Sequence, residues 1–135
     1  KQYQVKKICD ENNIDFFAYS PLSFGILCID PDKEENKEKS FIRNSLFENY
    51  KKPTYELRRC LKRIAHQRSV SQAQVAINWC CYQGTIPLVG MRKKSQVIDV
   101  SNVFNWNLKK NEFKVLQEVS KKCLKKMPKN PFSSN

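Results

Sequence analysis

Two short stretches of this sequence carry residue types suited to holding a phosphate-bearing ligand. Residues 18–22 (Ala-Tyr-Ser-Pro-Leu) end an apolar, strand-like run, and residues 85–93 lead from a second such run into a helical pattern. Ligands bind at the carboxyl ends of strands in parallel α/β folds. Arg92 and Lys93 also bring positive charge to a helix start, where the helix dipole favours an anion. The stretches therefore predict a phosphate site on an α/β scaffold, with an ordinary strand-to-loop turn and a solvated basic turn as the alternatives.

The elements that must position these stretches alternate between helix and strand. Val5, Ile8 and Cys9 share one face of a helix that ends at residues 12–13, and residues 14–19 predict a buried strand. The elements expected after these are a helix over 55–67, a helix that Ser71 caps and that stops near Gly84, a short strand over 85–89, and helices over about 94–103 and 109–124. This order is typical of a parallel sheet with crossover helices.

Residues 23–54 form a long connection in this pattern. Residues 30–40 are almost wholly polar or charged and predict an exposed loop, whereas residues 41–50 are apolar enough for a short helix. A connection of this length is uncommon without a task such as covering a ligand, and an insertion without function is the open alternative. Residues 125–135 contain two prolines and few apolar side chains, so they predict a loose tail.

Composition limits the possible classes of protein. The chain has 135 residues, enough for one domain but about half of a ~250-residue (β/α)8 barrel. Its net charge is +12, but the scattered lysines favour solvated helix faces over a nucleic-acid surface. Six cysteines without a C-x-x-C spacing and a single histidine argue against a zinc site and indicate reduced thiols in a cytoplasmic protein. No apolar run approaches the ~18 residues of a membrane span, and the amino-terminal residues lack the apolar core of a signal peptide.

The sequence resembles the aldo-keto reductase family. The resemblance is carried by residues 74–79 (Gln-Val-Ala-Ile-Asn-Trp), residues 84–92 (Gly-Thr-Ile-Pro-Leu-Val-Gly-Met-Arg) and residues 96–97 (Gln-Val), and their order and spacing extend it over roughly residues 1–122. It is nearest to plant-like and pyridoxal-reductase-like members. The resemblance implies a helix-rich, partial (β/α)8 barrel. Residues 1–124 would form its carboxyl-terminal part, from the sixth helix through the last two strands and their helices, with residues 125–135 as the tail.

The family binds NADPH across the carboxyl end of its barrel, and the resemblance implies cofactor contacts in this chain. The residues matched to these contacts are Tyr19, Ser20, Pro21, Leu22, Gly90, Met91, Arg92, Lys93, Gln96 and Asp99.

Each matched residue has an implied role. Tyr19 corresponds to the aromatic residue that stacks on nicotinamide, although its position at a strand end also suits a core tyrosine. Residues 20–22 correspond to the turn at ribose and pyrophosphate, and residues 90–93 to the segment around the adenosine 2′-phosphate. Gln96 corresponds to another adenosine contact, and Asp99 to the acidic residue that accepts a hydrogen bond from the adenine amine. Val100 stands where the family usually has Asn, which removes one polar contact.

By resemblance, the whole protein would be an NADPH-dependent reductase of aldehydes or ketones, and this chain would supply the cofactor bed. The family's catalytic Asp, Tyr, Lys and His lie on earlier strands, so none is assigned here and we expect the chain alone to be inactive. His66 falls on an outer helix and does not correspond to the catalytic His.

Two other functions stay open at this point. One is a non-catalytic, nucleotide-binding or regulatory subunit of the same fold, and the less favoured one is a basic nucleic-acid-binding protein. Because two strands alone would leave unpaired edges, we expect association with the missing barrel half or with further copies of the chain. We expect no membrane partner.

Overall fold

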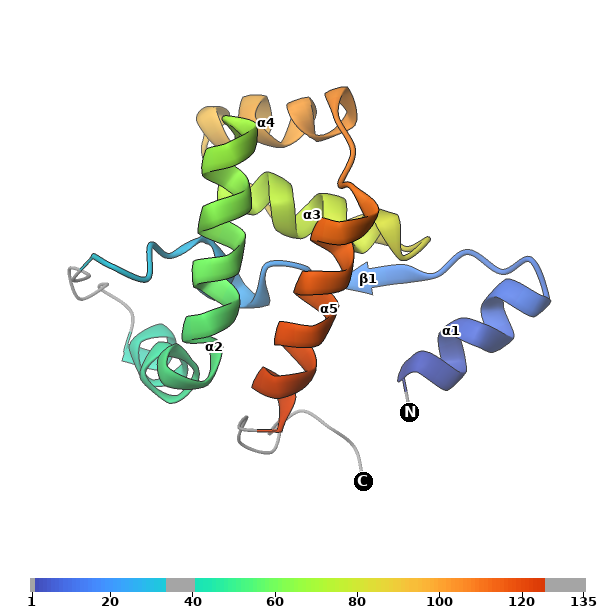
Figure 1. Ribbon diagram of the computed structural model, residues 1–135, viewed down its shortest axis with the longest axis horizontal. Helices are drawn as coiled ribbons and strands as arrows, with labels where there is room; N and C mark the ends of the chain where they lie inside the picture. Colours follow the sequence, from blue (N-terminus) through green and yellow to red (C-terminus); the bar gives the residue numbers. More distant parts are fainter. Residues whose placement is uncertain (1, 34–40, 126–135) are drawn as a thin grey trace.

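The computed structural model describes the backbone of residues 2–33 and 41–125, and the side chains of residues 4–33 and 48–125. It is a helix-rich α/β arrangement, in which Figure 1 shows the helices around β1 (Phe17–Tyr19). The described strands form one two-stranded parallel sheet. In chain order the elements are α1 (Gln2–Glu11), β1 (Phe17–Tyr19), the 3-10 segment η1 (Ser23–Cys28), α2 (Phe41–Arg68), α3 (Gln72–Tyr82), β2 (Ile86–Leu88), α4 (Lys94–Ser101), the 3-10 helix η2 (Asn102–Asn105) and α5 (Lys110–Leu124). Within the described ranges, no helix combines the length and the apolar character needed to cross a bilayer.

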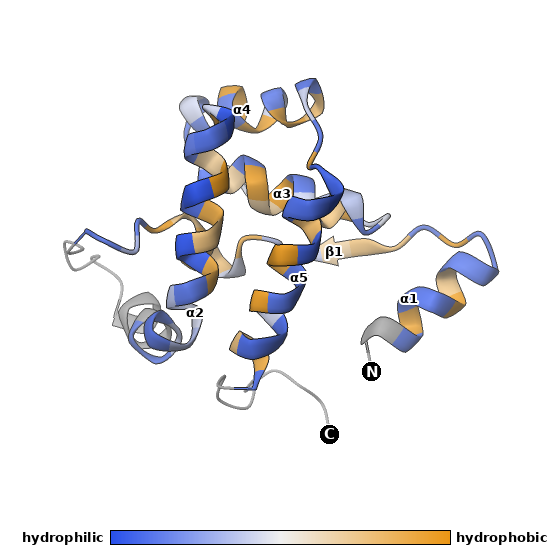
Figure 2. Ribbon diagram, in the orientation of Figure 1, coloured by the Kyte–Doolittle hydropathy of each residue, from blue (hydrophilic) through white to orange (hydrophobic). Residues whose placement is uncertain are grey.

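The core of the chain lies where α2, α3 and α5 pack together. Leu61 and Ile64 of α2, Val75 of α3 and Leu116 of α5 are at most 1% exposed. The α2 residues recur at the helical period that the sequence predicts for one buried face. Figure 2 shows the same division, with apolar residues along α3 and on the facing sides of α2 and α5, and polar residues outside. Of these three helices, α3 packs against the sheet, at β2.

The sheet leaves its other face bare. In the parallel register Phe17 lies beside Ile86, and Tyr19 lies beside Leu88. These four side chains share one face and are between 42% and 80% exposed. The alternate residues of the two strands, which point to the opposite face, are half-buried. The exposed face is apolar, which is unusual for a sheet surface that is left in water.

Several elements differ from the prediction in extent. The two strands, Phe17–Tyr19 and Ile86–Leu88, are shorter than the predicted 14–19 and 85–89. The predicted helix over 94–103 instead ends at Ser101 and continues as η2. The predicted tail lies outside the described residues, apart from residue 125, and so do residues 34–40 of the predicted loop.

The predicted connection over residues 23–54 is confirmed in one part and wrong in another, because residues 41–50 are helical but belong to the same helix as residues 55–67. Residues 23–28 form η1, and α2 runs from residue 41 to residue 68 without interruption, through Pro53. Proline removes one backbone N–H from a helix. Nearby side chains bond to carbonyls of the same turn, because the Thr54 hydroxyl donates to the Tyr50 oxygen at 2.6 Å and the Arg58 guanidinium donates to the Lys51 oxygen at 3.0 Å. These bonds offset part of the cost of the proline.

Candidate functional site

The structure brings the two predicted segments to the same edge of the sheet. β1 and β2 are parallel, and their last residues, Tyr19 and Leu88, are paired. Residues 20–22 and 89–93 therefore leave the sheet side by side, and α4 begins immediately after them. Convergence of two strand ends with a helix start is the arrangement at which α/β folds bind ligands.

At the end of β1, the chain turns so that an aromatic ring is left open. Tyr19 is 80% exposed, while Leu22 packs against the core. Ser20 has a φ of 51°, and its carbonyl accepts a hydrogen bond from the Ser23 N–H at 2.9 Å. Left-handed backbone is uncommon for a residue with a side chain and is often found at functional sites. The turn over residues 20–23 thus fixes the strand end and leaves the Tyr19 ring uncovered.

At the end of β2, the chain presents open backbone and two cations. Apart from Gly90 itself and its two chain neighbours, no described residue has an atom within 4 Å of the point where a Cβ on Gly90 would stand. Met91 is 42% exposed, and Arg92 and Lys93 are exposed as well. In the described part of the chain, neither of these cations forms an ion pair. A guanidinium and an ammonium without carboxylate partners are suited to an anion such as phosphate.

Gln96 holds the loop between β2 and α4. Its Oε1 accepts hydrogen bonds from the backbone N–H of Arg92 at 2.8 Å and of Lys93 at 3.0 Å. Lys93 occupies the N-cap position but has no acceptor in its side chain, so Gln96 provides the cap from within the helix. The amide oxygen of Gln96, which the resemblance matches to an adenosine contact, is therefore already bonded to the loop backbone. These bonds fix the backbone positions from which the Arg92 and Lys93 side chains extend.

Asp99 faces α3. Its Oδ2 accepts from the Ser71 hydroxyl at 2.6 Å, and its Oδ1 accepts from Gln74 Nε2 at 2.7 Å. Ser71 is the N-cap of α3, as the sequence predicts, because its Oγ accepts from the Gln74 N–H at 3.1 Å. Val100, one residue further along α4, is half-buried. The predicted cofactor contacts around α4 are therefore of two kinds. The cations at its start are exposed, whereas the Asp99 carboxylate near its end is already hydrogen-bonded within the protein.

Polar side chains on α3 tie this region together, and the sequence interpretation missed them. Gln74 and Asn78 are 5% and 4% exposed. Gln74 Oε1 accepts from the Trp106 indole at 3.1 Å, and Asn78 donates to the Trp106 carbonyl at 2.8 Å. Polar residues four positions apart on a mostly apolar helix share a face, and that spacing was the available signal.

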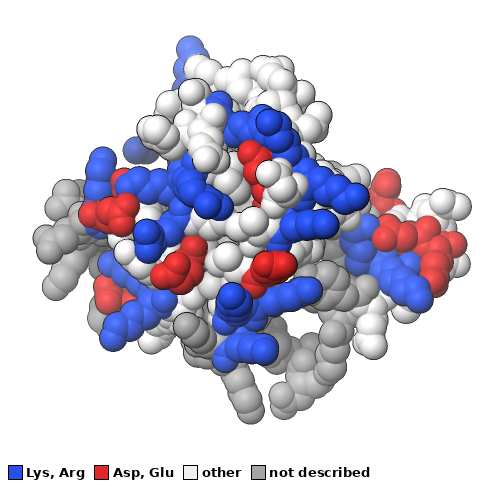
Figure 3. All heavy atoms as spheres, in the orientation of Figure 1, with Lys and Arg blue, Asp and Glu red and all other residues white. Residues whose placement is uncertain are grey.

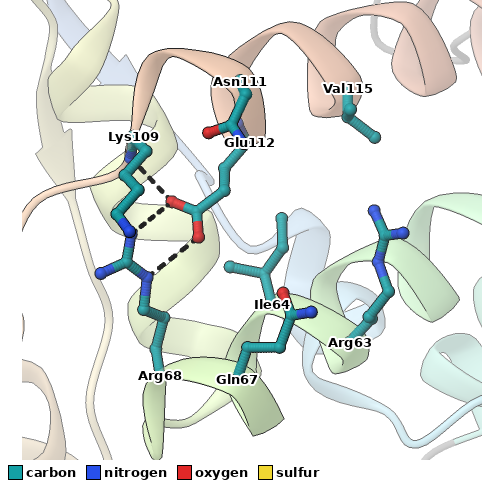
Figure 4. Close-up of a pocket in the computed structure, with 8 residues that line it drawn as sticks. All are labelled: Arg63, Ile64, Gln67, Arg68, Lys109, Asn111, Glu112 and Val115. Carbon is teal, nitrogen blue, oxygen red and sulfur yellow. Dashed lines mark hydrogen bonds and ion pairs between the residues drawn. The ribbon is translucent and has the colours of Figure 1, made fainter.

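The described residues also line an open cavity of about 500 Å³ between α2 and α5. Figure 4 shows Arg68 and Glu112 joined on one side of it and Arg63 standing apart on the other. The Arg68 guanidinium donates twice to the Glu112 carboxylate, at 2.8 and 2.9 Å. Burial alone would raise the pKa of Glu112, but the bonds from Arg68 and from the Lys109 N–H outweigh burial and lower this pKa.

None of the predicted site residues lines this cavity, so it is separate from the candidate site. Figure 3 shows lysines and arginines spread over the surrounding surface with acidic side chains between them, as on solvated helix faces. His66 is exposed on α2, as predicted. No cluster with the ligands for a metal ion was found among the described residues.

Comparison with known proteins identifies the class. The model of the aldo/keto reductase family matches residues 1–121. This chain belongs to that family.

Its relatives are longer proteins. The chain is 33% identical over 134 residues to the chloroplastic pyridoxal reductase of Arabidopsis thaliana, covering 99% of this chain and 36% of the relative. It is 27% identical over 120 residues to rhazimal reductase 2 of Alstonia scholaris, covering 88% of this chain and 30% of the relative. Its fold is similar to that of a glycerol dehydrogenase from Gluconobacter oxydans, with a TM-score of 0.66 and 25% identity, covering 94% of this chain and 40% of that one. The chain thus spans about a third of the length of the curated relatives it matches.

Proposed function

We propose that this chain supplies the NADPH-binding edge of an aldehyde or ketone reductase. Family membership supports an oxidoreductase, and the pyridoxal and rhazimal reductases, to which the chain is similar, are named for reducing carbonyl-bearing compounds. The observation that carries the proposal is the convergence of an open tyrosine ring and two cations at one sheet edge, neither cation having an ion-pair partner among the residues that the structure describes.

We further propose that the chain is the carboxyl-terminal part of a (β/α)8 barrel that an earlier segment of the same protein completes. Among the described residues, each strand has one neighbour, whereas every strand of a closed barrel has two. The exposed apolar face of Phe17, Tyr19, Ile86 and Leu88 has the character of a barrel interior. The relatives' greater length provides enough chain for the missing strands.

The residues at the edge have the chemistry that a dinucleotide phosphate requires. Tyr19 would stack its exposed ring on the nicotinamide, and the turn over residues 20–22 would offer backbone N–H groups and a hydroxyl to the phosphates. Arg92 would fork onto the 2′-phosphate, while Lys93 would act as a point charge. When bound, NADPH supplies the hydride that reduces a carbonyl carbon. These side chains bind and orient it, and the proton donor belongs to the part of the barrel outside this chain.

The test is cofactor preference in the intact protein. Arg92→Glu should cost about 1–3 kcal/mol of binding free energy for NADPH, as expected for loss of a charged hydrogen bond, and little for NADH. Lys110→Glu makes the same charge change at the start of α5 and serves as the control. Fluorescence titration measures both dissociation constants. Equal losses for the two cofactors would show that Arg92 acts structurally, and failure of the unmodified protein to bind either one would refute the proposed function.

A further inference from the structure

Asp99 is a predicted cofactor contact whose two carboxylate oxygens are both already bonded to side chains of the protein. Both carboxylate oxygens accept short hydrogen bonds, one from the Ser71 hydroxyl at 2.6 Å and one from Gln74 Nε2 at 2.7 Å. Hydrogen bonds to an ionised carboxylate are stronger than bonds between neutral groups. The donors sit at the first turn of α3, so the two bonds join the far end of α4 to the start of α3.

The donors themselves are fixed by further bonds. The Ser71 Oγ accepts from the Gln74 N–H at 3.1 Å, and Gln74 Oε1 accepts from the Trp106 indole at 3.1 Å. Gln74 is 5% exposed, so its amide group has little access to water. If Asp99 turned toward a ligand, a buried amide donor would lose its acceptor. Leaving the buried Gln74 amide without an acceptor costs more free energy than a new bond to the adenine amine would contribute, because that amine can bond to water instead.

The link from Asp99 to the two open cations runs along a short path. Asp99 and Gln96 are one helical turn apart on α4, and Gln96 Oε1 binds the backbone N–H groups of Arg92 and Lys93. Anchoring α4 at Asp99 therefore restrains the place from which both cations project. Displacement by about 1 Å at a charged binding site is enough to lower affinity markedly.

We propose that Asp99 is a positioning residue that clamps α4 onto α3, and that it does not bind the adenine amine. The clamp holds Arg92 and Lys93 at the sheet edge and so sets the preference for a 2′-phosphate. This assignment rests on the proposed function for its effect on the cofactor, while the clamp itself rests on the hydrogen bonds alone.

The binding experiment uses the intact protein with three ligands: NADPH, NADH, and the NADPH analogue in which hypoxanthine replaces adenine. The variants are Asp99→Asn and Ser71→Ala, which break the clamp from its two sides, and Ser101→Ala as the control. Ser101 is exposed on α4, and within the described ranges its hydroxyl donates only to the Ile98 carbonyl of the same helix.

The expected results separate the two roles. The unmodified protein should bind NADPH and the hypoxanthine analogue with similar affinity. Asp99→Asn and Ser71→Ala should each weaken both ligands by the same factor of about 10, as for loss of a charged hydrogen bond, and should reduce the ratio of NADPH to NADH affinity. A general loss of stability would leave that ratio unchanged. The proposal is overturned if hypoxanthine alone weakens binding to the unmodified protein and Asp99→Asn abolishes the difference.

A second measurement does not depend on cofactor. Amide hydrogen exchange across α4 should become at least about 10-fold faster in Asp99→Asn, in the absence of ligand, and should not change in Ser101→Ala. Unchanged exchange in Asp99→Asn overturns the clamp. If the unmodified protein binds no dinucleotide while α4 still loosens in Asp99→Asn, the proposed function and the cofactor role of the clamp fail together, and the clamp alone is supported.

Discussion

Asn78 of α3 organises the chain segment between α4 and α5, and its removal should be costly. Its Nδ2 donates to the carbonyls of Val103 at 3.3 Å and Trp106 at 2.8 Å, and its Oδ1 accepts from the Leu108 N–H at 3.1 Å. Asn78, Val103 and Leu108 are each at most 4% exposed, so water cannot replace these bonds without an opening of the structure. The Asn78 side chain therefore provides hydrogen-bond partners for three backbone groups that lie between α4 and α5, outside regular α-helix.

The magnitude follows from those three bonds. Each contributes about 1 kcal/mol, and a buried N–H left without an acceptor costs more than an average bond. We therefore expect Asn78→Ala to lower the free energy of local unfolding by about 3 kcal/mol, which is about two orders of magnitude in the opening equilibrium. Asn78→Asp should be destabilised less than Asn78→Ala but more than the unmodified protein. One carboxylate oxygen can still accept from the Leu108 N–H, whereas the other would face the Val103 and Trp106 carbonyl oxygens to which the amide donates.

The assay is amide hydrogen exchange of a peptide spanning residues 103–109 in the intact protein, with urea unfolding alongside it. Exchange at Leu108 should become about 100-fold faster in Asn78→Ala. Asn105→Ala is the control, because Asn105 is exposed and donates only to the Asn102 side chain at 3.1 Å. If Leu108 exchange stays within a factor of about three of the unmodified protein, the bonds do not stabilise the segment and the reasoning is wrong.

Two further predictions concern titrating groups. The lowered pKa of Glu112 means that its pair with Arg68 stabilises the fold above the ordinary carboxyl pKa and loses this effect as the pH falls through the lowered value. Acid unfolding monitored between pH 6 and pH 3 should therefore be less steep in Glu112→Gln, while Glu118→Gln at an exposed position should behave as the unmodified protein. Burial raises the pKa of Cys80 to about 11, so iodoacetamide at pH 8 should modify the exposed Cys28 well before Cys80, as peptide mass spectrometry would show. Modification of Cys80 first would contradict the assigned burial.

The features that the sequence predicts well are those that depend on neighbouring residues. The buried face of Leu57, Leu61 and Ile64 follows from helical spacing, and Ser71 caps α3 through its own backbone turn. Gly84, near which the sequence predicts the end of this helix, has a φ of 70°, which glycine adopts without strain. In each case the cause lies within one or two turns, where a sequence pattern contains the whole interaction.

The features that the sequence does not predict depend on distant partners. Pro53 indicates a helix boundary, yet α2 passes through it because α3 and α5 pack on the rest of the helix. The strands are shorter than their apolar runs, because strand length depends on hydrogen bonding to neighbours. Asp99 meets Ser71 and Gln74 across separations of 28 and 25 residues. The family resemblance marked it as a polar contact but gave no direction for its carboxylate.

The candidate site has α3 packed on one side of it, while the exposed face of β1 and β2 lies on the other. Behind it, α3 places Val75 and Ala76 in the core and directs Gln74 and Asn78 toward the segment that follows α4. In front, the apolar face of β1 and β2 has no cover in the described chain. The bonds of Gln96 inside this chain therefore restrain the backbone of Arg92 and Lys93. Under the proposed function, the depth at which nicotinamide would lie against Tyr19 would depend on the strands that complete the sheet. Changes to the α3–α4 bonds should thus act on phosphate preference, and changes to the sheet face should act on the reacting end.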